Sequence, residues 1–248
     1  TERSRLLGIA AIGKRDSRKP AYGVTHTDWN NDGWQDILVQ VYGRQWNRLW
    51  RNNGDGTFTD VAEETTYDGD SDRSGRYSEE TRRHFKERRS VDLKDEPEWR
   101  ANGNTFDCGV ADFDGDGDMD CFLGEITHAW AGPSADRSML LVNQGRESGF
   151  AFRREERFRR NVRGENWNQG DLHVGWLDVD NDGRLDLLIA GSDYPDDQLL
   201  RLYHQTPEHT FEDWTSRLGF RWVSASQISL GDFDRDGATD ILVGRNHV

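Results

Sequence analysis

The sequence has little of what marks several common protein classes. Two cysteines among 248 residues are too few for a disulfide-rich scaffold or a cysteine-based zinc module. No apolar run approaches the roughly 18 residues that a membrane-spanning helix needs, so no transmembrane segment is expected. Positive charge is also scarce, because 32 Lys and Arg stand against 46 Asp and Glu. The resulting net charge of -14 argues against nucleic acid as a partner.

The remaining composition indicates a folded, loop-rich chain. Hydrophobic residues make up 33%, but the chain also has 26 glycines and 11% aromatic residues, whereas charged disordered chains lack aromatics. The first residue is Thr1, and residues 1–14 lack the order of basic, apolar and small residues of a signal peptide. We therefore expect a processed or excised chain from which any export signal has been removed.

Four segments share one design, in which an acidic loop separates two apolar strands. They are residues 23–39, 108–124, 174–191 and 228–244. In the first three units a second pair of strands follows, over residues 47–61, 138–152 and 200–214. Four short strands in about 50 residues are typical of a β-propeller blade, and a β-sandwich is the alternative architecture.

The repeats predict a single all-β domain, part of a β-propeller ring of four-stranded blades with about four blade units and one helical insertion. Both ends of the sequence fall inside a blade, so we expect part of a larger propeller or a chain completed by another element. Ser78, followed by Glu79 and Glu80, predicts the start of a helix within the insertion. The expected segments are the end of a preceding blade (1–21), a blade (22–66), the insertion (67–103), two further blades (104–160 and 172–216) and a half blade (225–248).

Two runs of positive charge stand out in this acidic chain, one in the insertion and one after the second unit. They are either a solvated surface neutralised by neighbouring glutamates or a docking surface for an acidic partner. The runs consist of Arg82, Arg83, Lys86, Arg88 and Arg89, and of Arg153, Arg154, Arg157, Arg159, Arg160 and Arg163.

The acidic loops follow the pattern D-x-[DN]-x-D-G-x-x-D. Oxygen-bearing side chains occupy positions 1, 3, 5 and 9, glycine at position 6 allows a sharp turn, and position 7 supplies a backbone carbonyl. Crowded carboxylates repel one another without a cation, and an oxygen-rich set without His or Cys favours calcium over zinc. A purely solvated acidic turn is the alternative. The sequence predicts about four Ca²⁺ ions, with side-chain ligands Asp28, Asn30, Asp32, Asp36, Asp112, Asp114, Asp116, Asp120, Asp178, Asp180, Asp182, Asp186, Asp232, Asp234, Asp236 and Asp240, and backbone ligands Trp34, Asp118, Arg184 and Ala238.

These loops resemble the FG-GAP and VCBS-type calcium-binding propeller repeats of integrin α-subunits and many secreted bacterial proteins. Residues 47–64 resemble in particular the repeats of the cartilage acidic protein and UnbV-type group. The resemblance runs from about Gly23 to Val248 and implies a propeller of about seven blades, structural calcium and an extracytoplasmic location, whether secreted, periplasmic or at the cell surface. It implies no shared catalytic activity. The insertion, Asn30 and the incomplete last blade depart from the family pattern, so the blade number stays open.

Motifs typical of enzymes are missing from the sequence. No G-x-S-x-G, H-E-x-x-H, Walker or Rossmann pattern occurs, and His26, His173 and His204 on predicted strands are interpreted as packing residues. We expect a non-catalytic scaffold or interaction subunit that binds a protein partner in a larger assembly. A polysaccharide lyase or hydrolase, or a carbohydrate-binding module with a glycan ligand, is the alternative, because propeller architecture does not decide activity.

Three aromatic residues follow the second strands of their units and are candidates for an exposed binding face. Trp46, Trp130 and Tyr194 would stack on a sugar or contact a protein partner, and packing between blades is the competing interpretation. Cys108 and Cys121 occupy positions that hold aliphatic residues in the other units. We expect two buried free thiols, with a disulfide across the hairpin as the alternative.

Overall fold

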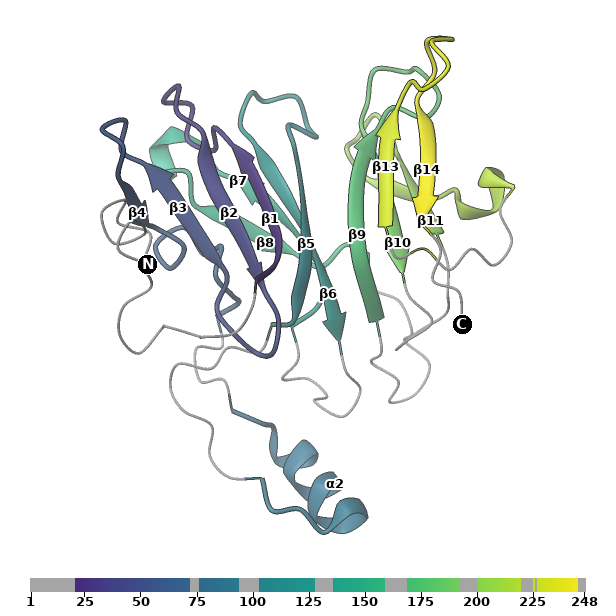
Figure 1. Ribbon diagram of the computed structural model, residues 1–248. Helices are drawn as coiled ribbons and strands as arrows, with labels where there is room; N and C mark the ends of the chain where they lie inside the picture. Colours follow the sequence, from purple (N-terminus) through teal and green to yellow (C-terminus); the bar gives the residue numbers. More distant parts are fainter. Residues whose placement is uncertain are drawn as a thin grey trace.

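The fold is almost entirely made of antiparallel strands. A computed structural model describes residues 21–71, 76–93, 103–127, 136–158, 169–191, 200–219, 225 and 227–244. Within these residues one α-helix accompanies fourteen strands (Figure 1). The all-β prediction with one helical insertion is therefore confirmed. None of the helices in the described part of the chain is both long enough and apolar enough to cross a membrane.

The first unit is a four-stranded meander. Strands β1 (Ala21–Thr27), β2 (Asp36–Val41), β3 (Arg48–Asn52) and β4 (Phe58–Asp60) pair in chain order. Leu38 pairs with Leu49 across β2 and β3, and both side chains are fully buried. The two hairpins predicted for this unit are thus present, with the acidic loop joining β1 to β2.

The second and third units repeat this arrangement, and the fourth contributes one hairpin. Within each unit every strand pairs antiparallel with the next. Short 3₁₀ helices η2 (Arg146–Ser148) and η3 (Thr215–Leu218) accompany them. The strands are β5 (Thr105–Ala111), β6 (Asp120–Thr127), β7 (Met139–Asn143), β8 (Phe152–Glu155), β9 (Gln169–Leu177), β10 (Asp186–Gly191), β11 (Leu200–Gln205), β12 (Phe211–Asp213), β13 (Gln227–Gly231) and β14 (Asp240–Gly244).

Hydrogen bonds also join the second unit to the third, which the sequence did not predict. Ile126 pairs with Gly170 and Thr127 with Gln169, so β6 and β9 link the two units into one longer sheet. The pairing lies at the end of β6 away from the acidic loop. Close approach is possible there because Gly124 has no side chain, and a Cβ at this position would lie 3.0 Å from the Asp171 carbonyl oxygen.

Alternate side chains of the central strands pack into different hydrophobic clusters. On β6, Leu123 belongs to a cluster shared with the first unit, whereas Phe122 belongs to a cluster shared with the third. On β10, Leu187 faces the second unit and Leu188 the fourth. A strand buried on both faces needs a continuous apolar run, which explains the uninterrupted hydrophobic residues after each acidic loop.

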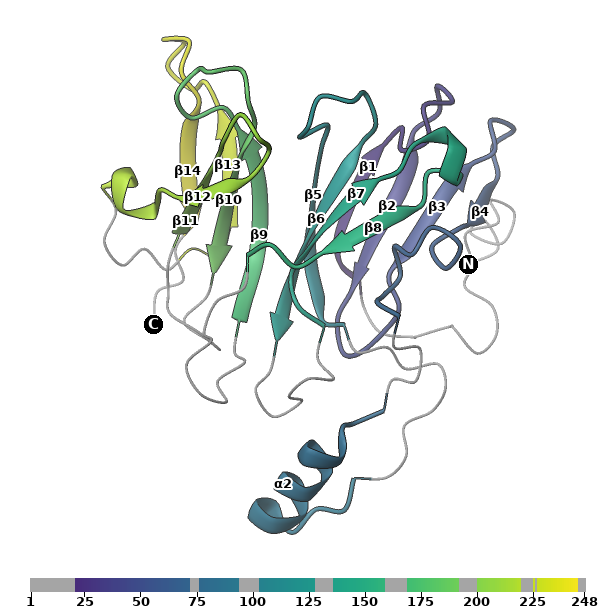
Figure 2. The same ribbon diagram turned by 180° about the vertical axis from the view of Figure 1, so that it is seen from behind.

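The units are arranged side by side as a fan (Figures 1 and 2). Their first strands are neighbours, because β1 contacts β5, β5 contacts β9, and β9 contacts β13. Gly109 and Gly175 allow this proximity: a Cβ at Gly109 would lie 3.0 Å from Val174, and one at Gly175 would lie 2.8 Å from Leu230. All four acidic loops project from the same edge of the fan, the upper edge in Figure 1.

The insertion contains the predicted helix. Helix α2 (Glu79–Arg89) lies beyond the opposite edge of the sheets (Figure 1). Ser78 is its N-cap as predicted, since its Oγ accepts a hydrogen bond from the Thr81 backbone N–H at 3.1 Å. Arg82 makes a hydrogen bond within the insertion, because its Nη1 donates to the Leu93 carbonyl at 2.6 Å.

Two side-chain expectations can be compared with the structure. Cys108 and Cys121 are buried free thiols, which confirms the preferred interpretation. Only 4% of Trp46 is accessible, which agrees with the packing interpretation and contradicts an exposed binding face at this residue. The segment after β4 folds back over Trp46, with the Asn47 N–H donating to the Asp68 carbonyl at 3.1 Å. Residues 1–20, Trp130 and Tyr194 lie outside the described residues.

Candidate functional site

The four acidic loops share one hydrogen-bond pattern. In the first, Asp28 at position 1 accepts the N–H of Asp32 on Oδ1 at 3.0 Å and that of Gly33 on Oδ2 at 2.8 Å. The position 5 carboxylate then accepts the N–H of position 7 in all four loops at 2.8–2.9 Å. Asp178 and Asp232 repeat both bonds of Asp28. The acidic side chains therefore stabilise the turn by accepting hydrogen bonds from the backbone of their own loop.

Two loop positions have a left-handed backbone. The glycines at position 6 have φ between 88° and 90°, as the sequence pattern required. Position 4 is also left-handed, with φ of 53° at Asn31, 76° at Gly115, 59° at Asn181 and 66° at Arg235. Sequence analysis missed this second requirement, although Asn and Gly at three of the four positions are the residues that adopt this conformation most readily.

The closing aspartate at position 9 fastens the loop to the sheet. Asp36 accepts the Trp29 N–H on Oδ2 at 3.1 Å and the Asn52 N–H of β3 on Oδ1 at 2.8 Å. Asp120 and Asp186 accept the equivalent pairs of bonds. Burial raises the pKa of the Asp36 carboxyl to about 6 and that of Asp120 to about 7, against the effect of these bonds. A cation at the loop would favour the ionised carboxylates instead.

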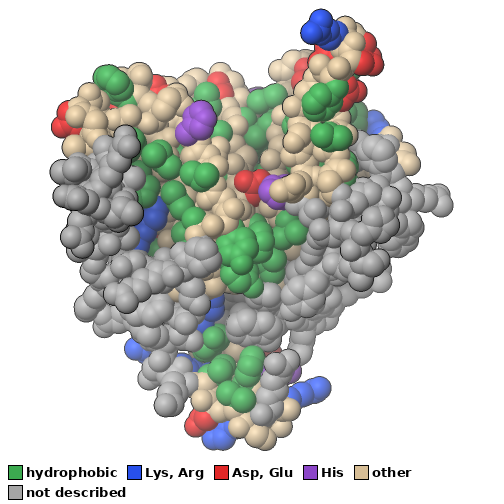
Figure 3. Space-filling model, in the orientation of Figure 1, with side chains coloured by type: hydrophobic (Ala, Val, Ile, Leu, Met, Phe, Trp, Pro, Cys, Tyr) green, Lys and Arg blue, Asp and Glu red, His purple; other side chains and the backbone are tan. Residues whose placement is uncertain are grey.

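Three of the loops gather carboxylate oxygens at metal-binding separations. In each group one oxygen per residue lies within 4.8 Å of the others. Figure 3 shows acidic side chains at the upper rim of the molecule, where the loops lie. The groups are Asp112, Asp114 and Asp120; Asp178, Asp180 and Asp182; and Asp232, Asp234 and Asp240. These clusters of hard oxygen atoms could hold a metal ion.

The hydrogen bonding of the loop oxygens, like their spacing, is compatible with a bound cation. Among the described residues, Asp112 Oδ1, Asp114 Oδ1 and Asn30 Oδ1 are buried without a hydrogen-bond partner. Buried acceptors are normally satisfied, so these oxygens are open to a metal ion or a water molecule. Asn30 does not prevent its loop from offering an oxygen, because its Nδ2 donates to Asp32 at 2.9 Å and leaves Oδ1 unpaired.

The third loop has two neighbours that the sequence pattern did not reveal. His204 Nδ1 lies 3.0 Å from Asp186 Oδ1, and the ring stacks on Trp214 with centroids 3.6 Å apart. His204 forms a further possible ligand group with Asp180 and Asp186. The register of the β10–β11 hairpin, in which Leu187 faces Tyr203, is the signal that places His204 beside Asp186.

Arg184 at position 7 makes the third loop electrostatically different. Its guanidinium forms an ion pair with the Asp182 carboxylate, and its Nε donates to the Gln205 carbonyl at 3.0 Å. A protein cation thus already contacts one of the expected ligands. A metal ion at this loop would share Asp182 with Arg184, whereas no equivalent basic side chain occupies position 7 of the other loops.

The first and second loops are joined directly. Asn31 Nδ2 donates to the Gly117 carbonyl at 3.1 Å and to Asp118 Oδ1 at 2.8 Å. Its backbone is left-handed, with φ of 53°. The first and second acidic loops, in adjacent units, are therefore in hydrogen-bond contact.

Comparison with known families agrees with the loop pattern. Residues 28–77 and 178–243 match the family described as FG-GAP-like repeat. Each match begins at position 1 of an acidic loop, Asp28 in the first unit and Asp178 in the third. No curated protein gives a significant match to the chain. The two matched stretches support the FG-GAP/VCBS repeat family for this chain.

Proposed function

We propose that this chain is a calcium-stabilised β-propeller domain that acts outside the cytoplasm as a non-catalytic interaction or scaffold subunit. Propeller architecture is supported by the fan of meanders, whose first strands are neighbours. It is also supported by three hydrophobic clusters, each shared by two consecutive units. Blades of a propeller bury their faces only against neighbouring blades, and these clusters have that form.

The observation that carries the calcium proposal is the repetition of one loop geometry with unsatisfied oxygen atoms. Backbone N–H groups donate to some of the carboxylate oxygens, as Gly117 does to Asp112 Oδ2. Asp112 Oδ1 and Asp114 Oδ1, in contrast, are buried without a hydrogen-bond partner. Carboxylates at this density without a counter-charge would destabilise the fold. Calcium suits such loops because it accepts six to eight oxygen ligands in flexible geometry.

The interaction role follows from the scaffold and from the matched repeats. Loops that project from a rigid sheet assembly are common binding elements. FG-GAP-like repeats are consistent with a non-catalytic domain, and within that family we propose kinship with the cartilage acidic protein and UnbV-type group. Protein partners in a larger assembly and an extracytoplasmic location complete the proposal.

Thermal unfolding with calcium, magnesium or excess EDTA tests the metal proposal. An ion bound only by the folded state at 100 times its Kd adds about 2.7 kcal/mol per site. We expect calcium to raise the melting temperature clearly, EDTA to reverse the increase, and magnesium to act more weakly. Native mass spectrometry should show about four bound calcium ions. An unchanged melt in EDTA would refute structural calcium.

A pair of matched variants controls for general effects of removing a carboxylate. Asp232→Asn changes position 1 of the fourth loop, whereas Asp55→Asn changes an aspartate in the Gly-rich turn between β3 and β4. One oxygen of the Asp55 carboxylate accepts hydrogen bonds from the N–H and the hydroxyl of Thr57, and the Oδ1 of an asparagine can accept both. Only Asp232→Asn should lower the number of bound ions. If both variants lost bound calcium equally, calcium stabilisation could not be assigned to the acidic loops.

A further inference from the structure

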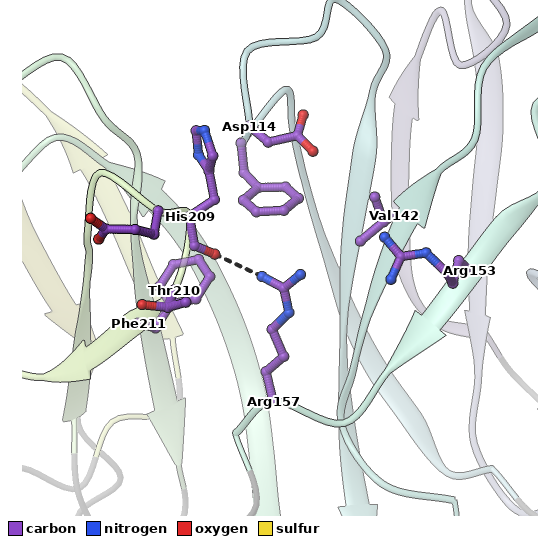
Figure 4. Close-up of a pocket in the computed structure, with 9 residues that line it drawn as sticks. Asp114, Val142, Arg153, Arg157, His209, Thr210 and Phe211 are labelled. Carbon is purple, nitrogen blue, oxygen red and sulfur yellow. Dashed lines mark hydrogen bonds between the residues drawn. The ribbon is translucent and has the colours of Figure 1, made fainter.

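A pocket lies between the second and third units, beside the second acidic loop. It has a volume of about 380 Å³, which is within the usual range for small-molecule sites. Figure 4 shows that side chains from both units face this space. Its main lining residues are Phe113, Val142, Arg153, Arg157, His209 and Phe211.

Two guanidinium groups of the second basic run enter this pocket. Glu155 lies between them, accepting from Arg157 Nε at 2.5 Å and pairing with Arg153 through its other oxygen. The three side chains together keep one positive charge, whereas Asp114 and Glu208 add two carboxylates to the lining, so a cation at the second acidic loop would be needed to offset Asp114. Arg157 Nη1 also donates to the His209 carbonyl at 2.8 Å, which holds the guanidinium across the boundary between the units (Figure 4). Among the described residues, none accepts a hydrogen bond from Arg157 Nη2.

Aromatic rings form the apolar wall of the pocket. The Arg157 guanidinium carbon lies 5.5 Å from the Phe113 ring centroid, and the Phe113 and Phe211 rings are 6.1 Å apart. Burial lowers the pKa of Arg157, while Asp114 and Asp120 counter the effect. A partly desolvated guanidinium favours a carboxylate ligand, because the planar N–H groups match two carboxylate oxygens.

We propose that this pocket binds a carboxylated sugar residue, a uronic acid within an oligosaccharide. Arg153 and Arg157 would bind the carboxylate, and the C–H face of the sugar ring would pack on the half-buried Phe211, because Phe113 is only 4% exposed. Thr210 and Glu208 at the rim offer the hydroxyl and carboxylate groups that sugar hydroxyls need as partners. The alternative ligand, an Asp or Glu side chain of a partner protein, would contact the two arginines but leave the aromatic and rim residues without a partner. The inference rests on the proposed function as an interaction domain and names the ligand of that domain.

Calorimetric titration of the calcium-loaded protein tests the assignment with three probes. These are trigalacturonate, a mannuronate trimer and a hyaluronan tetrasaccharide, which together present three different uronic acids. The methyl ester of trigalacturonate is the matched neutral control, because it keeps the rings and removes the charges. We expect at least one uronide to bind, and the methyl ester to bind at least tenfold more weakly than that uronide.

Variants connect the binding to the two arginines. Arg157→Gln and Arg153→Gln should each weaken uronide binding at least tenfold, and Arg217→Gln should not. Arg217 is a suitable control because its guanidinium stacks on Trp214 at 3.7 Å and does not line the pocket. The exposed Arg153 keeps the test valid if loss of the Arg157–His209 hydrogen bond impairs folding. Melting curves in calcium show which variants are folded.

Several results would overturn the proposal. They are binding of none of the three uronides to folded, calcium-loaded protein, equal binding of the methyl ester, or unchanged binding in both arginine variants. Tight binding of acetate or of a polyglutamate peptide, without preference for uronides, would assign the pocket to carboxylates of another source. The calcium melt is an independent measurement, so failure of the sugar site alone leaves the proposed calcium-stabilised domain intact.

Discussion

Replacing Glu125 by glutamine is expected to remove a pH dependence of folding stability. Glu125 lies on β6, is only 1% exposed, and accepts hydrogen bonds from the Asn104 N–H at 2.6 Å and the Thr105 hydroxyl at 2.5 Å. Burial raises its pKa to about 7, more than these hydrogen bonds lower it. The carboxyl group is therefore largely protonated in the folded protein below neutral pH.

Charged neighbours of Glu125 act in both directions. The nearby Arg154 lowers the pKa of Glu125, and Asp171 raises it. Asp136 is also buried, and desolvation raises its pKa well above the usual range, with Asp70 and Glu125 adding to the effect. These groups lie at the ends of the strands away from the acidic loops, so their titration is distinct from that of the loop aspartates.

The sign of the effect follows from proton binding. Between the unfolded pKa of 4.5 and the folded pKa of about 7, the folded state retains a proton that the unfolded state loses. Glu125 therefore contributes stability that is fully present below about pH 4.5 and is lost as the pH rises through about 7. A shift of that size corresponds to about 3 kcal/mol in the free energy of unfolding, at about 1.4 kcal/mol per pKa unit.

Urea denaturation from about pH 5 to about pH 8, in saturating calcium, measures this effect. Glu125→Gln mimics the protonated carboxyl, so its stability relative to wild type should improve by up to about 3 kcal/mol across that range. Exposed Glu147 provides the control, and Glu147→Gln should follow wild type throughout. A constant difference between Glu125→Gln and wild type at every pH would refute the reasoning.

Four further substitutions test the loops and the packing of the units. Asp112→Asn should weaken calcium binding by calorimetry about tenfold more than Asp178→Asn, because the third loop already shares a ligand with arginine. Asn31→Gly keeps the left-handed backbone but loses the hydrogen bonds to Gly117 and Asp118. Urea denaturation should show a free energy of unfolding lower by about 1 kcal/mol. Unchanged stability would contradict the bridge between the loops. Gly175→Val should destabilise by about 1–3 kcal/mol, because β13 lies within contact distance of the added side chain, and a neutral result would mean that the first strands can separate freely.

The sequence was informative about the acidic loops because their contacts are local. Asp28 bonds to N–H groups four and five residues later, so the spacing of the motif contains the geometry. The same holds for Ser78 and Thr81 at the start of α2. Repetition then extended one local pattern to four places, and the resulting all-β class with one helical insertion agrees with the structure.

Features that depend on distant segments were not predicted. His204 reaches the third loop through the register of a hairpin, eighteen residues from Asp186. For Trp46 the sequence left exposure and packing open, and the segment after β4 decides for packing by covering it. The link between β6 and β9 likewise depends on how two units meet. Each requires knowledge of which surfaces adjoin, and a repeat pattern does not specify this.

The acidic loops are also connected to the boundaries between units. Asn143 donates its backbone N–H to Asp120 at 2.8 Å and its side-chain N–H to the Trp29 carbonyl of the first unit at 3.1 Å. Gln205 makes the equivalent bonds to Asp186 and to the Phe113 carbonyl of the second unit, both at 2.8 Å. An ion that fixes a closing aspartate thereby also fixes the residue that joins two units. Removal of calcium should consequently loosen loops and unit boundaries together, and calcium should shift one cooperative unfolding transition.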